Sequence, residues 1–293
     1  MAPPFVSVIV PTHGREDLVL RAVSSVLRQS VESIEVIVVD DGSAPPIDFP
    51  SDLRDERLRV VRRTQNCGAA AARNTGVENA RGDWLAFLDS DDVWHADKLR
   101  LQLDEAARWP SDSPIAFASG WRYVRDLKVV SEIMPVDADT PARFAAGSWF
   151  NPGSTILIRR ELAVRIGPQD ERLRRLEDYD WFLRFAFAGG RLKVVRKSLV
   201  DVRWHRGLDD KIVRAAAAVI AREYLRPGGR YFVADKAIRR RIRSYLQLSE
   251  ASAAWHRGRR VRGLTALMRS LLWYPRLQMQ VEPLWTSKLP TVP

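Results

Sequence analysis

Three carboxylates occur within four consecutive residues, in the segment Asp-Ser-Asp-Asp at positions 89–92. Asp89 and Asp91 stand two residues apart, so in a tight loop both can converge on one cation. Mg²⁺ and Mn²⁺ accept such carboxylate oxygens at about 2.0–2.2 Å. A cation bound there can bridge to a diphosphate and stabilise the negative charge that develops when the diphosphate leaves. The alternative is that the segment only caps a helix that begins near Ala96.

This acidic segment follows a predicted strand, and so do two other polar segments. Short apolar runs predict buried strands at 5–10, 34–39, 58–61 and 84–88. Pro11-Thr12 follows the first run, and Asp40-Asp41 follows the second. Because ligands of open parallel sheets bind beyond the carboxyl ends of the strands, we expect these groups to face one cleft. No glycine-rich phosphate loop follows the first run, so a carboxylate-bound cation is the natural partner of a phosphate.

Helical periodicity alternates with these strands. Apolar residues recur on one side of residues 18–27, and the Ala-rich residues 69–80 predict a second helix. Shorter strands at 115–119 and 154–158 and a helix at 180–188 are expected further on. This alternation predicts an α/β fold with a mostly parallel, Rossmann-like sheet and helices on both faces.

The formal charge of +11 on the 293-residue chain belongs to its last third. Residues 201–293 hold 19 Lys+Arg and 7 Asp+Glu, a net of +12, whereas residues 1–200 hold 28 basic and 29 acidic side chains. Helical periodicity accompanies this charge at 212–225, 236–254 and 260–272. We therefore expect a basic helical C-terminal extension that forms a separate functional segment.

Four segments of the chain match a known family in order and in spacing. They are VSVIVPTHGR at 6–15, VVDDGS at 38–43, NCG at 66–68 with ARNTG at 72–76, and FLDSDD at 87–92. Together they strongly resemble glycosyltransferase family 2, whose members are nucleotide-diphospho-sugar transferases of the GT-A fold. Two later segments, LEDYDWFLR at 176–184 and VRWH at 202–205, resemble the family's acceptor-side Glu-Asp motif and its late histidine segment.

The resemblance implies an inverting, metal-dependent glycosyltransferase that moves a sugar from a UDP- or dTDP-linked donor to an acceptor hydroxyl. Polysaccharide or glycoconjugate biosynthesis is the expected setting, with a glycan, lipid-linked or small-molecule acceptor. Residues 1–206 are expected to form the GT-A catalytic domain, with a nucleotide-sugar-binding half at 1–113 and an acceptor-side half at 114–206. Residues 207–293 are expected to form the basic helical region.

In the nucleotide pocket, the resemblance places Pro11, Thr12 and Arg15 along the wall. The chain departs from the family pattern at His13-Gly14, where an aromatic residue and an asparagine are common. This departure affects the details of the base pocket and leaves the reaction class unchanged.

The base itself is expected to bond to Asp40, with Asp41 as the adjacent partner. A carboxylate that accepts a hydrogen bond from a ring N–H favours uracil or thymine over purines. Arg73 is expected near the nucleotide, and Ser90 belongs to the same set of nucleotide-sugar-binding residues.

The resemblance divides the roles in the acidic segment. Asp91 is the expected direct metal ligand, Asp89 faces the ribose or the sugar and contributes to the metal site, and His205 is the candidate third ligand. Imidazole suits Mn²⁺ better than Mg²⁺. Arg203 and Arg206 flank His205 and can reach a diphosphate as bidentate donors.

Asp178 is the expected general base, because an inverting transfer needs one carboxylate to take the proton of the attacking hydroxyl. The metal assists the leaving group, so no partner acid is required. Glu177 is the second candidate for the base. The alternative is that Glu177, Asp178 and Asp180 only favour the N-terminus of the following helix.

The basic extension allows several partners. The residues Leu264, Leu267, Met268, Leu271, Leu272 and Trp273 are expected on one face of a basic amphipathic helix. Such a helix fits an anionic membrane surface, or a bundle that packs on the catalytic domain or forms a homodimer. The rival function is a nucleic-acid- or membrane-binding protein with a non-catalytic α/β domain, but no nucleic-acid motif accompanies the charge.

Processivity and location follow from what the chain lacks. Val200 stands three positions before Arg203, where a processive synthase is expected to carry glutamine, and no apolar stretch approaches the roughly 20 residues of a membrane span. Single transfers are therefore expected. One cysteine, Cys67, and an N-terminus without a signal-peptide pattern favour a cytoplasmic protein, with a peripheral position at the inner face of the membrane as the alternative.

Overall fold

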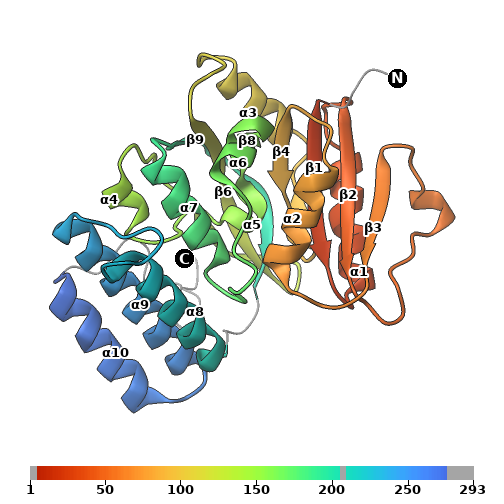
Figure 1. Cartoon of the computed structure of the whole chain (residues 1–293). Helices are drawn as coiled ribbons and strands as arrows, with labels where there is room; N and C mark the ends of the chain where they lie inside the picture. The colour runs from red at the N-terminus through yellow and green to blue at the C-terminus, as the bar shows by residue number, and fades with distance from the viewer. Residues whose placement is uncertain (1–4, 205–208, 276–293) are drawn as a thin grey trace. The chain divides into compact units, whose positions relative to one another are not determined.

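The structure is a computed structural model that describes residues 5–204 and 209–275 (Figure 1). The chain divides into two compact units. The sheet unit comprises Met1–Asp137, Phe150–Glu171 and Arg191–Trp204, and the helical unit comprises Ala138–Trp149, Arg172–Gly190 and His205–Pro293. The internal segments Ala138–Trp149 and Arg172–Gly190 thus group with the C-terminal helices. The sequence-based assignment instead places a single domain boundary after residue 206. The sequence-based domain assignment stays a prediction.

The sheet unit contains all the strands of the described residues. Its strands are β1 Val6–Thr12, β2 Ile34–Asp41, β3 Leu58–Arg63, β4 Trp84–Phe87, β5 Val93–Trp94, β6 Ile115–Arg125, β7 Lys128–Ile133, β8 Leu157–Arg159 and β9 Arg191–Arg203. Its helices are α1 Glu16–Leu27, η1 Ser51–Leu53, α2 Ala69–Asn79, α3 Lys98–Ala106, α5 Pro152–Thr155 and α6 Arg160–Ile166.

Within the described residues, the strands form one sheet in the order β3-β2-β1-β4-β8-β6-β9-β5, with β7 paired to β6. Strands β1 to β4 run parallel, and β6 runs parallel to β9. Strands β5, β7 and β8 add antiparallel pairs. The predicted α/β class is confirmed, and the sheet is parallel from β1 to β4 and mixed beyond β4.

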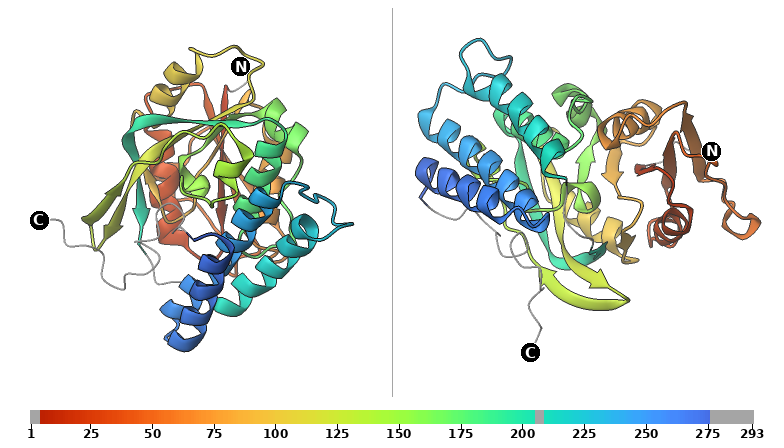
Figure 2. Two further views of the ribbon diagram at one scale, coloured as in Figure 1. Left: turned by 90° about the vertical axis from the view of Figure 1, so that its left-hand side faces the viewer. Right: turned by 90° about the horizontal axis from the view of Figure 1, so that it is seen from below.

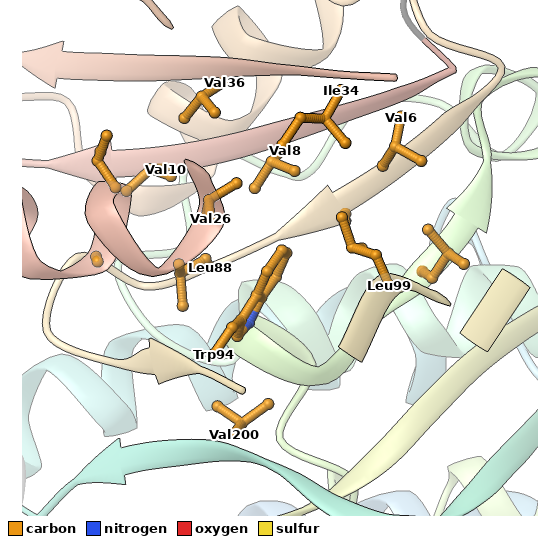
Figure 3. Packing of buried hydrophobic residues seen from close by; sticks show 14 of the residues in the cluster. Val6, Val8, Val10, Val26, Ile34, Val36, Leu88, Trp94, Leu99 and Val200 are labelled. Carbon is orange, nitrogen blue, oxygen red and sulfur yellow. The ribbon is translucent and has the colours of Figure 1, made fainter. Parts of the chain in front are cut away.

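The alternation of side chains along the strands decides which helix covers each face. Even-numbered residues of β1 and β2, such as Val8 and Val36, pack with Val26 of α1 and Leu99 of α3 (Figure 3). Odd-numbered residues of β2 pack with Ala72 of α2 in a separate cluster. Because successive side chains of a strand point to opposite faces, apolar runs without polar interruption produce a sheet that is covered on both sides.

Two sequence-based expectations for the sheet unit require correction. Residues 154–158 were expected to form one strand, but α5 occupies Pro152–Thr155 and the strand β8 begins only at Leu157. The acidic segment at 89–92 does not cap a helix near Ala96, because α3 begins at Lys98 with Asp97 as its N-cap residue. The carboxylates of the segment are therefore left for other partners.

The helical unit contains α4 Pro141–Phe144, α7 Glu177–Phe187, α8 Asp210–Leu225, α9 Lys236–His256 and α10 Arg260–Trp273. Helices α8, α9 and α10 lie side by side in both views (Figure 2). The α4 and α7 segments meet through aromatic rings, with Phe144 stacked on Phe182 at a centroid distance of 6.3 Å and edge-on to Phe185 at 5.7 Å. The three predicted basic helices are confirmed.

Candidate active site: two acidic clusters

The acidic loop at the end of β4 contains one carboxylate that is buried and held in place. The Asp92 Oδ1 accepts a hydrogen bond from the backbone N–H of Arg203 at 2.9 Å, and its Oδ2 accepts one from the Ser154 hydroxyl. No Lys, Arg or His of the described ranges forms an ion pair with Asp92. Burial, reinforced by the charge of Asp89, raises the pKa of Asp92 well above its usual range. The loop therefore holds its carboxylates so close together that the ionised form of Asp92 is disfavoured.

The other two carboxylates of the acidic loop each hold a guanidinium group. Arg15 Nη1 lies 2.7 Å from Asp91 Oδ2, and Arg73 Nη2 lies 2.7 Å from Asp89 Oδ1. Arg15 follows β1 and Arg73 lies on α2, so three parts of the chain meet at this edge of the sheet. The structure thus brings together Arg15, Arg73, Asp89 and Asp91, which the sequence singled out. Each of the two carboxylates has a guanidinium group beside it.

Helix α5 supports the acidic loop, and sequence reasoning missed this contact. The Ser154 hydroxyl accepts a hydrogen bond from Asp89 N at 3.1 Å and also donates to Asp92. A Cβ atom on Gly153 would lie 2.3 Å from Asp89 Oδ2, so any larger residue there would displace the Asp89 carboxylate. The signal in the sequence is the short segment Asn-Pro-Gly-Ser at 151–154, whose last residue, Ser154, was predicted to begin a strand.

Three side chains spaced four residues apart hold α5 in place through hydrogen bonds. Trp94 donates a hydrogen bond to the carbonyl oxygen of Ser154 at 2.8 Å. Lys98 donates to that of Ile156 at 3.4 Å, and Gln102 donates to that of Thr155 at 2.8 Å. Lys98 is fully buried, and its Nζ lies 3.7 Å from the centroid of the Trp94 ring. Burial lowers the pKa of Lys98 well below its ordinary value.

The Asp40 carboxylate shapes the loop after β2. Its Oδ1 accepts a hydrogen bond from Ser43 N at 2.9 Å and its Oδ2 one from Ile47 N at 3.1 Å. Burial alone raises the pKa of Asp40, but the hydrogen bonds from Ser43 and Ile47 and the charge of Arg62 outweigh it, and the pKa is lowered. Asp40 is thus an ionised carboxylate whose two oxygens already have backbone partners.

The Asp41 carboxylate ties β2 to the start of α2. It accepts hydrogen bonds from Cys67 N at 3.2 Å and Gly68 N at 2.7 Å, and it pairs with Arg63 Nε at 2.9 Å. Cys67 contributes its backbone N–H to this contact. The expected contacts of Asp40 and Asp41 with a base stay predictions.

The end of β1 carries Pro11 and Thr12 beside these loops. The buried Thr12 Oγ1 has no hydrogen-bond partner among the described residues. The departure from the family pattern at His13-Gly14 has a local explanation: His13 Nδ1 lies 3.0 Å from Asp41 O, and Gly14 has φ +61°. Asparagine and glycine both tolerate this left-handed conformation, so glycine preserves the turn.

The Ala-Arg-Asn-Thr-Gly motif of α2 is largely architectural. Asn74 exchanges two hydrogen bonds with the backbone of Gln169, at 2.8 and 2.9 Å, and fixes that distant loop. A Cβ on Gly76 would lie 2.3 Å from Ile9 Cγ2, so glycine allows α2 to rest directly on β1. Arg73 is the member of the motif that reaches the acidic loop.

The second acidic cluster lies in the helical unit, in the first turn of α7. Asp180 is 3% exposed, pairs with Arg184 at 3.1 Å and accepts a hydrogen bond from the Tyr224 hydroxyl at 2.9 Å. Glu177 is also buried, whereas Asp178 is half-exposed. All three acids lie at the N-terminus of α7, as the alternative interpretation of Glu177, Asp178 and Asp180 predicts. Of the three, only Asp178 is partly exposed.

Asp178 has two neighbours within its own unit. Its Oδ1 accepts a hydrogen bond from Tyr179 N at 2.7 Å. Tyr245 of α9 packs on Tyr179 with a centroid distance of 4.4 Å, and burial together with the charge of Asp178 raises the pKa of Tyr245 to about 12. The C-terminal helix α9 therefore contributes a neutral phenol beside Asp178.

The predicted third metal ligand, His205, and its neighbour Arg206 lie outside the described residues. The described part of that segment ends at Trp204, and the contact of Arg203 N with Asp92 brings it to the acidic loop. Within residues 5–204 and 209–275, no group of three or more His, Cys, Asp or Glu side chains is arranged to hold a metal ion. Asp89 and Asp91 supply two of the predicted ligands.

Comparison with known proteins decides the family. The profile of glycosyl transferase family 2 matches residues 7–167. The chain belongs to this family. It is 31% identical over 207 residues to the amylovoran biosynthesis glycosyltransferase AmsB of Erwinia amylovora, a match that spans 67% of this chain and 68% of AmsB. The predicted enzyme class is therefore confirmed: this family 2 member is a glycosyltransferase.

Other relatives match over shorter stretches. The chain is 39% identical over 99 residues to the Escherichia coli UDP-Glc:alpha-D-GlcNAc-diphosphoundecaprenol beta-1,3-glucosyltransferase WfgD, which covers 33% of this chain and 39% of WfgD. For another relative, an uncharacterized glycosyltransferase of Rickettsia felis, the match spans 16% of that protein's length.

A solved structure of Staphylococcus aureus TarS, residues 1–349 in complex with UDP-GlcNAc, has the same fold as this family 2 glycosyltransferase. Its TM-score is 0.58 at 17% identity, covering 90% of both chains. This agreement confirms the GT-A fold. None of the helices in the described ranges combines the length and the hydropathy that crossing a bilayer requires.

Proposed function

We propose that this glycosyltransferase transfers a sugar from a UDP- or dTDP-linked donor to an acceptor hydroxyl with inversion at the anomeric carbon, in glycan biosynthesis. The observation that carries the proposal is the acidic loop after β4, where Asp89 and Asp91 point their carboxylates at cationic groups while Asp92 is buried beneath them. A loop built in this way attracts a cation to the edge of the sheet where ligands bind.

The donor set fits a divalent ion. Two carboxylates already hold guanidinium groups at 2.7 Å, and burial, together with the charges of Asp89 and Asp91, raises the pKa of Asp92. Asp91 and Asp89 would hold Mn²⁺ or Mg²⁺, with His205 as the third ligand. When bound, the ion supplies charge neutralisation to the diphosphate. The guanidinium groups of Arg15 and Arg73 would lie beside the diphosphate, since their geometry suits phosphate oxygens.

The remaining site residues take the following roles in the proposal. Pro11 and Thr12 line the nucleotide, Asp40 and Asp41 form the loop against which the base rests, and Ser90 belongs to the sugar-side wall. In support of a uracil nucleotide, the name of WfgD gives UDP-Glc as its donor, and TarS was solved with UDP-GlcNAc.

Asp178 is the general base of the proposal. It is the partly exposed member of its cluster, whereas Asp180 is committed to Arg184 and Tyr224 and Glu177 is buried. An acceptor hydroxyl would give its proton to the Asp178 carboxylate while its oxygen attacks the anomeric carbon. A lipid-linked saccharide is the acceptor class that the relatives support, since the name of WfgD states a diphosphoundecaprenol-linked acceptor.

The deciding experiment is a panel of nucleotide sugars tested for thermal stabilisation and for transfer, with Mn²⁺, with Mg²⁺ and with a chelator. A UDP- or dTDP-sugar should stabilise the protein in a metal-dependent manner, and product NMR should show inversion. Stabilisation by a purine-linked donor alone, or transfer that is unaffected by the chelator, contradicts the proposal. Asp104→Asn, an exposed surface carboxylate on α3, serves as the matched control for the Asp variants.

A further inference from the structure

Helix α10 presents its large apolar side chains away from the helix on which it packs. Its buried residues are all small, namely Gly263, Ala266 and Ser270, and they face α9. The exposed fractions are 81% for Val261, 51% for Leu264, 60% for Met268 and 81% for Leu272. These four residues are called the apolar stripe below. A helix that belonged only to a soluble bundle would turn such residues inward.

The structure corrects the face that was expected from the sequence. Leu267 and Leu271 are partly buried, so they do not belong to the outermost surface of α10. Val261, which was not expected there, does. Spacings of three, four and four residues align the apolar stripe along one side of the helix. Contact with α9 is close on the other side, where a Cβ on Gly263 would lie 3.3 Å from Ala251 O.

The helices that carry this stripe are strongly basic. Residues 236–275 contain ten Lys+Arg and a single acid, Glu250. Asp210 of α8 neutralises part of the charge, with Arg259 at 2.8 Å and Arg262 at 3.1 Å. Among the described residues, no carboxylate forms an ion pair with the exposed Lys236 or Arg240. Positive charge therefore remains on α9 for an external partner.

The basic and apolar features meet at the end of α10. The Arg243 guanidinium of α9 stacks on the ring of Trp273, with its Cζ 4.1 Å from the ring centroid. Arg241 stacks on Tyr274, with its Cζ 4.7 Å from the ring centroid. Trp273 is partly exposed. Aromatic rings combined with arginines are the side chains that settle at the headgroup level of a bilayer, where the apolar ring and the charged group are both accommodated.

We propose that the apolar stripe and the basic residues of α9 and α10 form a docking surface for an anionic lipid membrane. The stripe enters the boundary between headgroups and acyl chains, and the arginines and Lys236 pair with lipid phosphates. Charge complementarity decides the occupant, because a second copy of the chain would oppose one strongly basic surface with another. This inference is independent of the proposed donor, metal and base, and its test does not use activity.

The test is co-flotation of the full chain with phosphatidylcholine vesicles that contain or lack phosphatidylglycerol. The wild type should float with the anionic vesicles, less so at high salt, and not with pure phosphatidylcholine. Met268→Gln/Leu272→Gln and Lys236→Ser/Arg240→Ser should each lower binding by at least about tenfold. The matched control is Leu127→Gln/Val164→Gln, which removes two comparably exposed apolar side chains from the sheet unit and should float as the wild type does.

A fluorescent label distinguishes the membrane from other occupants. In a Cys67→Ser background, an environment-sensitive probe on Leu272→Cys should move to an apolar environment only when anionic vesicles are added, whereas a probe on Leu127→Cys should not respond. A probe at position 272 that is shielded before vesicles are added overturns the proposal in favour of residues 276–293 or a second copy. Light scattering then separates these two outcomes. Equal flotation of all variants also overturns the proposal.

Discussion

The two acidic clusters both contain buried carboxylates, but these carboxylates differ in whether a cationic side chain pairs with them. Each holds three acids within four residues. Asp92 is the buried acid of the acidic loop, and Asp180 and Glu177 are the buried acids of α7. The Asp180 carboxylate pairs with Arg184 at 3.1 Å, whereas among the described residues the Asp92 carboxylate accepts hydrogen bonds from the Ser154 hydroxyl and a backbone N–H and forms no ion pair.

This difference explains why the two clusters suit different chemistry. The raised pKa of Asp92 marks the acidic loop as a place where carboxylates lie close together, and a further cation there would favour the ionised form of Asp92, in keeping with the proposed metal and diphosphate. In α7, Arg184 balances the charge of Asp180, in keeping with the proposed role of the partly exposed Asp178 as the base. The following predictions test this contrast, in order of decreasing effect.

Asp91→Asn should have the largest effect. Loss of the charged ligand removes charge stabilisation of the leaving diphosphate, and transfer should fall by about a thousandfold, which corresponds to ~4 kcal/mol. Calorimetry with UDP and Mn²⁺ should show the loss in binding. The control Asp104→Asn should behave as the wild type, and metal-dependent binding of full strength by the Asp91 variant would refute the ligand assignment.

Asp178→Asn should lower kcat by about a hundredfold or more while donor binding is retained, because the base acts only on the acceptor proton. Single-turnover transfer and UDP calorimetry measure the two effects separately. Glu177→Gln is the comparison, and if it abolishes turnover while Asp178→Asn does not, the roles of the two acids are reversed.

Asp180→Asn should change stability more than chemistry. It leaves the nearly buried Arg184 without its carboxylate and should lower the free energy of unfolding by about 2 kcal/mol, less than the full cost of breaking a buried pair because asparagine still accepts from Tyr224. Urea denaturation measures this loss. A variant that is fully stable but inactive would move Asp180 into the catalytic set.

Ser154→Ala should weaken the acidic loop without removing any of its charges. The hydroxyl bridges Asp89 N and the Asp92 carboxylate, and its loss leaves a buried acceptor unsatisfied at a cost of about 1–3 kcal/mol. We expect a lower Tm and about tenfold weaker metal-dependent UDP binding, with Ser154→Thr restoring part of it. Unchanged metal dependence in a destabilised Ser154→Ala protein would limit the residue to a structural role.

Lys98→Met should produce the smallest effect, a change in the pH dependence of stability. The folded protein binds the Lys98 proton more weakly than the unfolded chain does, so between the lowered pKa and the ordinary value near 10.4 stability rises with pH. Lys98→Met should remove this slope and raise Tm at neutral pH. Chemical denaturation at several pH values between neutral and mildly alkaline measures it, and a slope identical to that of the wild type counts against a neutral buried lysine.

The sequence alone determined the features that depend on local pattern. Uninterrupted apolar runs dictated buried parallel strands, polar residues at their ends marked the ligand edge, and the motifs at 6–15, 38–43, 72–76 and 87–92 identified the family. Arg15, Arg73, Asp89 and Asp91 were singled out without knowledge of their contacts, and the structure joins them.

Only the tertiary structure decided how the acids divide their work. Whether a carboxylate is buried depends on segments far away in the chain: Ser154 and Arg203 for Asp92, and Tyr224 for Asp180. The short helix α5 was mistaken for a strand because four residues are too few to show a period. The outward face of α10 was likewise predicted only in part, since periodicity gives the angle between side chains but not the direction of the neighbouring helix.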